Sequence, residues 1–490
     1  MTSADPSDER EANPMRDFPG VYVNGRWAPS QGDRLVVTSP ATLEPVGSVT
    51  LATPADVDAA VAAARAAMAS DAWAAMSSVD RGALLGRVAD ALEKRSVEFG
   101  DLVSAEMGSP RKWASFGQVG TALGVLRTYE KLAAEYEFED TRRSAMGGEV
   151  VVRQLPVGVI GAILPWNAPL FTAALKIAPA LVAGCTMVLK PSPEAPLGIA
   201  LLTEVLEEAG LPPGVVNIVV GEAATGEALV AHAGVDKISF TGSTAAGKRI
   251  GAVCAADVRR CSLELGGKSA AIVLEDIELD RATVTGLVAG VMANNGQVCV
   301  AQTRILVPGS RYDEIVGALA EAADRLVVGD PCDPATQVGP VISAGARDRI
   351  DAHVRAAVEG GARIVTQVGD TPGPGWYVRP TVLADVDNDM PIARQELFGP
   401  VAVAIRYHDV DEAVALANDS DYGLAAAVWS ADRDHAFDVA SRLRVGSVAV
   451  NSSAPLDFGS PFGGFKQSGT GREGGPEAIA AFLEPQTIIR

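Results

Sequence analysis

The chain has few cysteines for its 490 residues, and nothing in their spacing points to cross-links. Neither CxxC pairs nor the dense spacing of a disulfide framework occurs among the five, which are Cys185, Cys254, Cys261, Cys299 and Cys332. This usage is typical of free thiols in a reducing cytoplasm, and it predicts no disulfide.

Long apolar runs and an excess of positive charge are also missing. No apolar run reaches the roughly 20 residues that a membrane-spanning helix needs. The chain has 41 basic and 61 acidic residues, which gives a formal charge of -20. This negative charge argues against nucleic acid or an anionic membrane as the main partner. Residues 1–18 are polar and lack the apolar core of a signal peptide, so they predict a disordered leader on a cytoplasmic protein.

What is present is an alternation of helical and strand-like segments. A helix is expected from Pro54, capped by Thr53, and a second one from about residue 79 to Gly108. From residue 157 onward, continuous apolar runs of strand length such as VGVIGAILP alternate with helical stretches. Strands that are apolar on both faces indicate a parallel sheet covered by helices on both sides. The length allows two to four domains at roughly 100 to 200 residues each.

After residue 265 the alternation resumes, from SAAIVLED through a helix near residues 281–295 to about residue 450. The sequence therefore predicts two doubly wound α/β domains. The C-terminal stretch ends in a short strand with nothing after it to pair with, and a terminal edge strand of this kind commonly joins another sheet or subunit.

One motif comes close to a nucleotide triphosphate site. Residues 242–249, GSTAAGKR, match the P-loop pattern except at the last position, where Arg249 replaces the hydroxyl that would hold Mg²⁺. A triphosphatase is therefore disfavoured. The strand before Gly242 and the helix after it still create a helix N-terminus that can face an anion. The dinucleotide fingerprint GxGxxG is absent from this turn.

Four further stretches carry residues suited to chemistry. They are LPWNAPL with Asn167, LELGGKSA with Glu264, GQVCVAQ with Cys299, and QELFGPV with Glu396. Taken singly, each has a purely structural interpretation: a helix cap for Asn167, solvated charges for the two glutamates, a turn at the glycines, and a buried apolar thiol for Cys299.

Together these stretches resemble the aldehyde dehydrogenase superfamily. The resemblance runs from about residue 20 to the C-terminus, and the motifs LPWNAP, KPS, FTGST, LELGGK, GQVC, QELFGPV and PFGGFKQSGTGRE follow the order of the family. It implies an NAD(P)-dependent, non-phosphorylating enzyme that oxidises an aldehyde to a carboxylic acid without a metal.

The resemblance also implies a domain plan. It predicts a Rossmann-like cofactor-binding domain over residues 19–137 and 156–263 and a catalytic domain over 264–467. A small β arm over 138–155 and 468–490 is expected to join copies into a homodimer or homotetramer.

The family mechanism assigns roles to three of the residues. Cys299, as thiolate, attacks the aldehyde carbon, while the Asn167 amide and the Cys299 backbone N–H hold the oxyanion. After hydride transfer to nicotinamide, Glu264 deprotonates the water that hydrolyses the thioester, a task suited to a partly buried carboxylate with a raised pKa.

Cofactor contacts are implied position by position. Lys190 matches the lysine that binds the adenosine ribose, and Trp166 the adenine-side wall of the crevice. The other implied cofactor contacts are Gly242 and Ser243 at the pyrophosphate, Gly266, and Glu396 at the nicotinamide ribose with Phe398 beside it. Lys176 and Glu473 match polar positions near the active centre whose roles vary in the family.

Two departures from family patterns concern specificity. Many members that prefer NAD read K-x-x-E, whereas this chain reads KPSPE, so Pro193 replaces the glutamate and Glu194 follows it. With no arginine expected nearby to grip a 2'-phosphate, NAD is the predicted cofactor and NADP a possible one. The residues expected to line the substrate tunnel are mostly apolar: Ala168, Phe171, Leu175, Val298, Val300, Leu456, Phe458 and Phe462.

Two other classes of protein compete with this interpretation. A cysteine hydrolase or esterase would need a histidine base, and none of His232, His353, His408 and His435 lies in a recognisable motif. A family-fold protein with a structural role would be expected to lack Cys299 or Glu264, and both are present.

Overall fold

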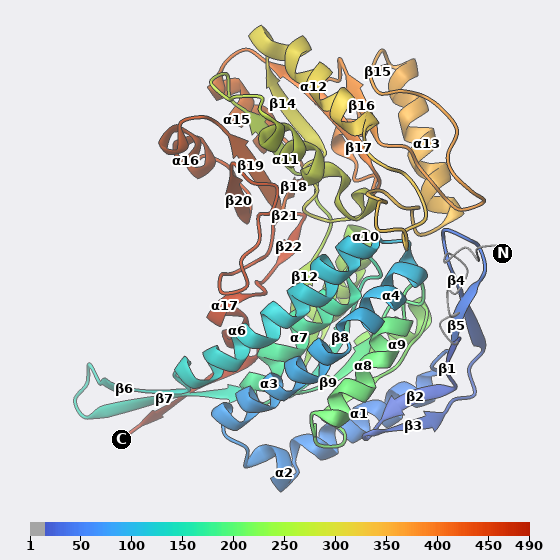
Figure 1. Ribbon diagram of the computed structural model, residues 1–490. Coiled ribbons are helices and arrows are strands. Elements are labelled where there is room, and N and C mark those ends of the chain that lie inside the picture. Colours follow the sequence, from blue (N-terminus) through green and yellow to red (C-terminus); the bar gives the residue numbers. More distant parts are fainter. Residues whose placement is uncertain (1–14) are drawn as a thin grey trace, which may run out of the picture.

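The computed structural model describes residues 15–490. Figure 1 shows two α/β halves, one coloured blue to green and the other yellow to red, and an arm that projects from the first half. Each half is built on one sheet, of eight strands in the first and seven in the second. The predicted α/β class with two largely parallel sheets is confirmed.

The described residues begin with a short sheet, which contradicts the predicted disordered leader over Arg16–Phe18. Residues Arg16–Phe18 form β1, which pairs in parallel with β5 (Pro45–Thr50), itself paired with β4 (Arg34–Thr38). Backbone pairing with β5 gives this segment partners that its polar sequence does not reveal. The rest of the predicted leader, residues 1–14, lies outside the described residues.

The eight-stranded sheet has its parallel strands in the middle. Its order is β22 (Gly469–Thr470), β12 (Arg260–Glu264), β11 (Lys237–Thr241), β8 (Val159–Ile163), β9 (Thr186–Lys190), β10 (Val216–Ile218), β2 (Gly20–Val23) and β3 (Arg26–Pro29). The pairs from β12 to β10 are parallel, whereas β22, β2 and β3 add antiparallel edges.

Helices cover both faces of this sheet (Figure 1). They are α1 (Pro54–Met68), α2 (Asp71–Ala74), α3 (Ser78–Lys94), α4 (Ser96–Met107), α5 (Arg111–Trp113), the π-helix η1 (Ala114–Gly120), α6 (Thr121–Glu135), α7 (Pro169–Ala183), α8 (Leu197–Glu208), α9 (Ala223–Ala231) and α10 (Thr244–Ala256). Thr53 caps α1, as predicted. The expected single helix ending at Gly108 is two, because Arg95 leaves helical geometry between α3 and α4.

The seven-stranded sheet forms the second half. Its order is β15 (Arg363–Ile364), β16 (Thr381–Ala384), β17 (Val401–Tyr407), β14 (Arg304–Pro308), β13 (Ala270–Val273), β19 (Ala425–Trp429) and β20 (Ser447–Val450). Its helices are α11 (Arg281–Met292), α12 (Tyr312–Asp324), α13 (Ala344–Glu359), α14 (Pro391–Arg394), α15 (Val410–Asn418) and α16 (Arg433–Ser441), with 3-10 turns at η2 (Ala293–Gly296) and η3 (Gly309–Arg311). A small pair, β18 (Tyr422–Gly423) and β21 (Phe465–Lys466), stands apart from this sheet.

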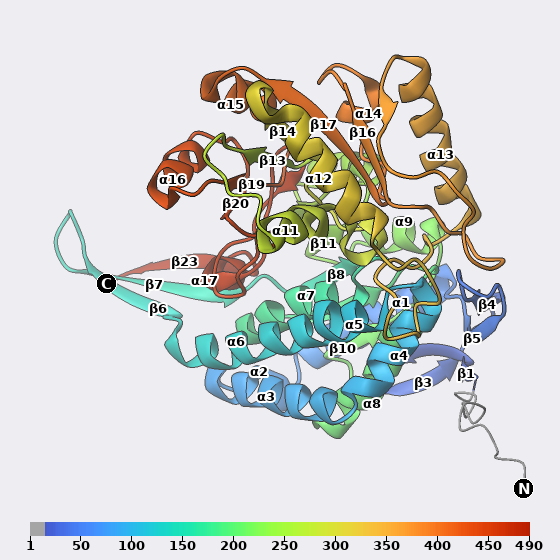
Figure 2. The ribbon, with the colours of Figure 1, turned by 45° about the horizontal axis from the view of Figure 1, so that its top comes forward.

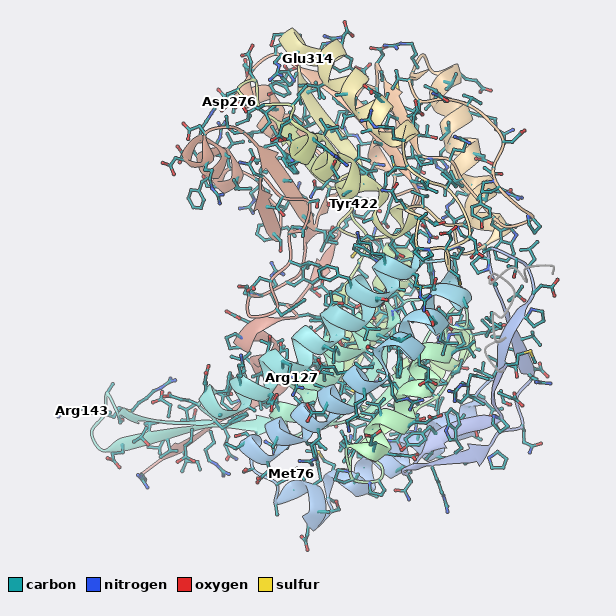
Figure 3. The ribbon with its side chains drawn as sticks, in the orientation of Figure 1. Met76, Arg127, Arg143, Asp276, Glu314 and Tyr422 are labelled. Carbon is teal, nitrogen blue, oxygen red and sulfur yellow. The ribbon has the colours of Figure 1, made fainter. Side chains whose placement is uncertain are left out.

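The projecting arm is a three-stranded antiparallel sheet (Figure 2). It consists of β6 (Glu139–Arg143), β7 (Glu149–Pro156) and the C-terminal β23 (Leu483–Ile489), which follows α17 (Gly475–Ala480). The terminal strand thus pairs with β7 of its own chain. Arg143 lies on the arm, outside the body of the molecule (Figure 3). The segment 468–490 also supplies β22, which extends the eight-stranded sheet instead of the arm.

A buried carboxylate joins two helices of the first half. Glu106, fully buried in α4, accepts hydrogen bonds from the backbone N–H groups of Leu197 (2.7 Å) and Gly198 (3.0 Å) at the start of α8. It satisfies donors that the first turn of a helix leaves unpaired. Burial raises the pKa of Glu106 to about 8, because the ionised carboxylate loses its hydration there.

We therefore expect Glu106→Ala to lower the free energy of unfolding by about 2–4 kcal/mol, because it leaves two buried donors unpaired. Glu106→Gln is the matched control, since it retains one of the two acceptor oxygens and should keep part of that stability. The midpoint of thermal unfolding, at one protein concentration, measures both. Equal midpoints for the Glu106→Ala variant and the wild-type protein would contradict the capping role.

Candidate functional site

The strands β8, β9, β11 and β12 all end at the same edge of the eight-stranded sheet, which faces the second half of the molecule (Figure 1). A cavity of about 1350 Å³ lies there, lined by residues of both halves. All of the predicted site residues line it: Trp166, Asn167, Lys190, Gly242, Ser243, Glu264, Gly266, Cys299, Glu396 and Phe398. The tertiary structure thus brings together side chains from six separate segments of the chain.

The loop before Cys299 has an unusual backbone. Asn294, Asn295 and Gly296 all have positive φ, between 50° and 72°. α11 ends at Met292, short of the predicted residue 295, because Ala293 already has a non-helical ψ of 139° and the left-handed residues after it cannot resume a right-handed helix. Glycine adopts such angles freely and asparagine tolerates them, which explains the sequence NNG at this point.

Buried amides hold this loop in place. Asn295 donates from Nδ2 to the carbonyl oxygens of Gly108 and Pro340, at 2.8 Å each, and accepts from Gly339 N–H at 2.6 Å. Gln297 accepts from Ile342 N–H at 2.9 Å. These bonds offset the cost of the left-handed residues, which is on the order of 1–3 kcal/mol each. They fix the loop before it reaches Cys299.

Asn167 is tied to the same loop. Its Nδ2 donates to the Gln297 carbonyl at 2.9 Å, and its own carbonyl accepts from Gln118 Nε2 (2.9 Å) and Asn294 Nδ2 (3.0 Å). Asn167 is not the cap of α7, whose N-cap is Ala168. The supporting residues Gln118, Asn294 and Gln297 were missed at the sequence level, although the unusually polar run NNGQ was a signal.

The Cys299 thiol is half-buried and packs beside Val300, Leu424 and Phe462. Burial, together with the nearby charges of Glu396 and Glu264, raises the pKa of Cys299 to about 12, and the backbone N–H of Val300 only partly opposes this. At neutral pH the sulfur therefore rests as a neutral thiol. The thiolate that the family mechanism requires therefore has to form as the sulfur attacks.

Glu264 ends β12 and is almost fully buried, with 3% of its surface exposed. The interpretation of Glu264 as a solvated surface carboxylate is wrong. Neither carboxylate oxygen has a hydrogen-bond partner among the described residues. Burial and, after it, the charge of Glu473 raise the pKa of Glu264 well above its usual value, while Lys176 and Arg472 act in the opposite direction.

Lys176 and Glu473 form a buried ion pair behind Glu264. Their Nζ and Oε1 atoms are 2.5 Å apart, and Lys176 also donates to Ser239 Oγ at 3.1 Å. Of the two, only Glu473 lines the cavity. A buried pair is held by its geometry and by further hydrogen bonds, so it places a fixed dipole next to the Glu264 carboxylate.

Glu396 reaches the cavity over two glycines. Its Oε1 accepts from Gly267 N–H at 3.0 Å, and a Cβ at Gly266 would lie 2.3 Å from its Oε2. A Cβ at Gly267 would lie 2.5 Å from the Cys299 carbonyl oxygen. Any larger residue would therefore displace either Glu396 or the Cys299 loop. Burial raises the pKa of Glu396 to about 7.

Trp166 and Phe398 are in edge-to-face contact, with ring centroids 5.4 Å apart and planes at 86°. The resemblance implies the adenine-side wall of the crevice for Trp166 and a place beside the nicotinamide-ribose glutamate for Phe398. In the structure the two rings lie side by side. Trp166 lies in the loop after β8 and Phe398 in the loop before β17. The two loops are far apart in the sequence, so the sequence does not reveal that these rings touch.

Lys190, at the end of β9, is a buried cation in the cavity wall. Burial lowers its pKa to about 8, against the charges of Glu194 and Glu222. Glu222 and Arg249 also line the cavity. In the sequence, Arg249 was notable only as the mismatch in the P-loop pattern. Lys190 and Arg249 are far apart in the chain, so the sequence does not show that both line one cavity.

The N-terminus of α10 opens onto the same cavity. Ser243 is its N-cap and accepts from Ala246 N–H at 3.3 Å, and Gly242 precedes it after β11. The sequence correctly placed a strand, a turn and a helix N-terminus here. The remaining backbone N–H groups of the first turn can face an anion.

The rest of the wall is apolar. All of the residues predicted for the substrate tunnel line the cavity, and Phe171 and Phe458 pack with centroids 6.3 Å apart. Trp113 and Phe116, from α5 and η1, line it as well and were missed. Phe116 is 73% exposed, so the apolar wall of the cavity continues to the protein surface. A π-helix of this length is uncommon and often marks a functional site.

Other kinds of site receive no support from residues 15–490. No group of three or more His, Cys, Asp or Glu side chains in this part is arranged to hold a metal ion. None of the helices in that range combines the length and apolar character needed to cross a membrane. The four histidines all lie within it, and none of them lines the cavity.

A thiol, a carboxylate and an amide thus line one cavity at the carboxyl edge of a doubly wound sheet. This arrangement is typical of α/β enzymes.

Comparison with known proteins identifies the class. The aldehyde dehydrogenase family matches residues 27–488. Geranial dehydrogenase of Castellaniella defragrans is 48% identical over 474 residues, covering 96% of this chain and 98% of that protein. A 3-succinoylsemialdehyde-pyridine dehydrogenase of Pseudomonas sp. is 42% identical over 481 residues, 97% and 99% of the two chains.

Solved structures agree. Mycobacterium tuberculosis aldehyde dehydrogenase in complex with NAD⁺ superposes with a TM-score of 0.95 at 43% identity, covering 97% of this chain and 99% of that one. Pseudomonas syringae aldehyde dehydrogenase C, as a variant bound to NAD⁺ and octanal, gives 0.91 at 40% identity over 96% of each chain. The chain belongs to the aldehyde dehydrogenase family, and it is an enzyme.

Proposed function

We propose that this enzyme oxidises an uncharged aldehyde of medium or bulky size to the carboxylic acid, with NAD as the hydride acceptor and Cys299 as the nucleophile. The observation that carries the proposal is the convergence of Cys299, Asn167 and Glu264 on one cavity, where both Glu264 oxygens are free of protein partners. The same cavity extends to Lys190 and the N-terminus of α10.

The residues present fit a dinucleotide. Small-molecule sites usually measure roughly 300–1,000 Å³, so a cavity of about 1350 Å³ has room for a cofactor and an aldehyde together. Lys190 and the first turn of α10 would hold the adenosine ribose and the pyrophosphate, and Glu396 the second ribose. The Thr241 hydroxyl, buried in this wall, has no hydrogen-bond partner among the described residues. Bound NAD would supply the acceptor for the hydride of the aldehyde.

The protein's own groups would carry the remaining steps. Cys299 rests as a thiol, so its proton passes to solvent as the sulfur bonds to the aldehyde carbon. The oxyanion that forms is stabilised by Asn167 Nδ2 and by the Cys299 N–H. Glu264 then takes a proton from the water that cleaves the thioester, which releases the acid and the thiol.

The competing cysteine hydrolase function lacks the histidine base that it would need. None of the four histidines lines the cavity, so the Cys299 thiol has no imidazole partner there. A purely structural role is disfavoured because the thiol, the amide and the buried carboxylate are all present and face one space.

The apolar wall supports the choice of substrate. Leu175, buried in α7, stands where a cationic or aromatic side chain would be needed for a charged aldehyde, because burying an unpaired charge is costly. Two of the relatives are named for, or bound to, uncharged aldehydes, geranial and octanal. We extend this preference to aliphatic, terpenoid and aromatic aldehydes in general.

The test is a panel of octanal, geranial, benzaldehyde, succinate semialdehyde and betaine aldehyde, with NAD reduction followed by absorbance. We expect kcat/KM to be about 100-fold or more higher for the best uncharged aldehyde than for the charged pair, which corresponds to roughly 3 kcal/mol for an unpaired buried charge. Leu175→Arg should narrow that gap for succinate semialdehyde, and Leu175→Met, of similar volume, should leave it unchanged. A wild-type enzyme that prefers either charged aldehyde would refute the apolar tunnel.

Cofactor choice is predicted from the charges near Lys190. Pro193 offers no hydrogen bond, but Glu222 lines the wall beside Lys190 and should repel a 2'-phosphate, while Arg249 should attract one. We expect NAD to be preferred, with measurable activity on NADP. Pro193→Glu should raise the NAD/NADP ratio of kcat/KM by a factor equivalent to about 1–3 kcal/mol, and Glu222→Gln should lower it.

The control for this prediction is Arg249→Ala, which should depress NADP use and spare NAD. If the wild-type enzyme favours NADP tenfold, or if neither carboxylate variant moves the ratio, the 2' position is recognised by other residues.

We also propose that copies of the enzyme associate through the arm in a homodimer or homotetramer, and that it works in the cytoplasm. Strand β6 is exposed along its whole length and leaves one backbone edge without a partner in its own sheet. Such an edge favours pairing with another chain.

A further inference from the structure

Two cysteines outside the cavity flank the turn between α10 and β12. Cys254 lies in the last turn of α10, and Cys261 is the second residue of β12. The short connection between these elements is closed by a hydrogen bond of 2.8 Å from Arg259 N–H to the Cys254 carbonyl. This turn brings the end of the helix against the start of the strand.

The register of the sheet directs both side chains to one side. Cys261 pairs with Ile238 of β11, and Leu263 pairs with Phe240, so these four share one face. All four pack in the apolar cluster that also contains Cys254, which is 1% exposed. Arg260 points to the opposite face, where it pairs with Glu484. Cys254 and Cys261 thus come from two elements that pack against each other, and their side chains belong to one apolar cluster.

Cys261 is also the more accessible of the pair. The edge strand β22 pairs only with Leu263 and Glu264, so it leaves the first residues of β12 uncovered. Cys261 is half-buried there, whereas Cys254 and Cys185 are buried. Interaction with the Cys254 thiol lowers the pKa of Cys261 to about 6, and the same interaction raises the pKa of Cys254. An accessible thiolate next to a second thiol is the usual arrangement of a redox-sensitive pair.

We propose that Cys254 and Cys261 are a modification site, a dithiol that peroxide converts to a disulfide that alters the cofactor cavity. The Cys261 thiolate attacks an oxygen of hydrogen peroxide, which forms a sulfenic acid and releases hydroxide, protonated to water. The Cys254 thiol then displaces hydroxide from that sulfur, which forms the S–S bond and a second water. Two thiols and one peroxide thus give one disulfide and two waters.

The link to the cavity runs through α10. Ala252 and Val253, next to Cys254, line the cavity together with Ile250. A disulfide has an S–S length of about 2.05 Å, shorter than any non-bonded contact between two sulfurs, so its formation draws the last turn of α10 toward β12. This displacement changes the wall that faces the cofactor. The disulfide should therefore weaken NAD binding, a consequence that rests on the proposed function.

The first experiment locates the bond. Cys299→Ala protein, which has no thiol at residue 299, is treated with a small molar excess of hydrogen peroxide, alkylated and digested with trypsin. Cleavage after Arg249, Arg259, Arg260 and Lys268 separates the two thiols, so the disulfide should appear as peptide 250–259 linked to peptide 261–268. Dithiothreitol should release it, and Cys254→Ser in the same background should abolish it. The absence of this linked pair, or prior oxidation of the buried Cys185, would overturn the site.

The second experiment measures NAD affinity by calorimetry on the same proteins. We expect the oxidised form to bind NAD at least threefold more weakly than the reduced form, with recovery in dithiothreitol and no peroxide effect in the Cys254→Ser background. A disulfide that leaves NAD affinity unchanged would overturn the link to the cavity. Failure of the reduced protein to bind NAD would instead contradict the proposed function, because peptide mapping does not depend on NAD.

Discussion

Cys299→Ala is expected to abolish aldehyde-dependent NAD reduction, with a loss in kcat of about 10⁴-fold or more, the scale seen when a nucleophile is removed. Only the sulfur is lost, and the half-buried position tolerates a smaller side chain. The fold and NAD binding should therefore be retained. Initial rates with the best aldehyde of the panel, together with an NAD titration of the variant, measure both parts of the prediction.

Cys299→Ser is the matched variant, since it keeps the shape of the side chain but replaces the sulfur with a much weaker nucleophile. It should be nearly as inactive as Cys299→Ala. Turnover of either variant above a few per cent of wild type would assign the nucleophile to another residue. Loss of NAD binding in both would instead indicate that the loop after Gly296 has collapsed.

Glu264→Gln should stall the enzyme at the acyl stage. The amide is isosteric but cannot take a proton from water, so a general base worth roughly 10²–10⁴ in rate is lost. Incubation of the variant with NAD and aldehyde should leave an acyl group on Cys299, visible as a mass increase of the intact protein and of the peptide that contains Cys299. A variant with full turnover and no adduct would move the base elsewhere.

The pH dependence of turnover tests the same group. Because burial and Glu473 raise the pKa of Glu264, the carboxyl holds its proton at pH values where a solvent-exposed glutamate has lost it. A protonated carboxyl cannot act as a base, so kcat should rise with pH through the raised pKa and level off above it. Glu264→Gln should remove this rise from the residual rate. An identical pH profile in the variant would assign the titration to another group.

The motifs named five residues that the structure places in the wall of one cavity, Cys299, Glu264, Asn167, Lys190 and Glu396. Asn167, Lys190 and Glu264 stand at the carboxyl ends of β8, β9 and β12, whereas Cys299 and Glu396 precede β14 and β17 of the other sheet. Local rules were equally reliable where the signal was local, as at the Thr53 cap of α1.

The tertiary structure decided what depends on burial and on neighbours distant in sequence. The raised pKa values of Cys299 and Glu264 follow from desolvation and from charges that other segments bring near, which no local pattern encodes. The same holds for the contact of Trp166 with Phe398 and for Arg249 in the wall shared with Lys190. Residue types and their order were therefore enough to name the reaction, whereas protonation states and packing partners arise only when separate segments exclude water together.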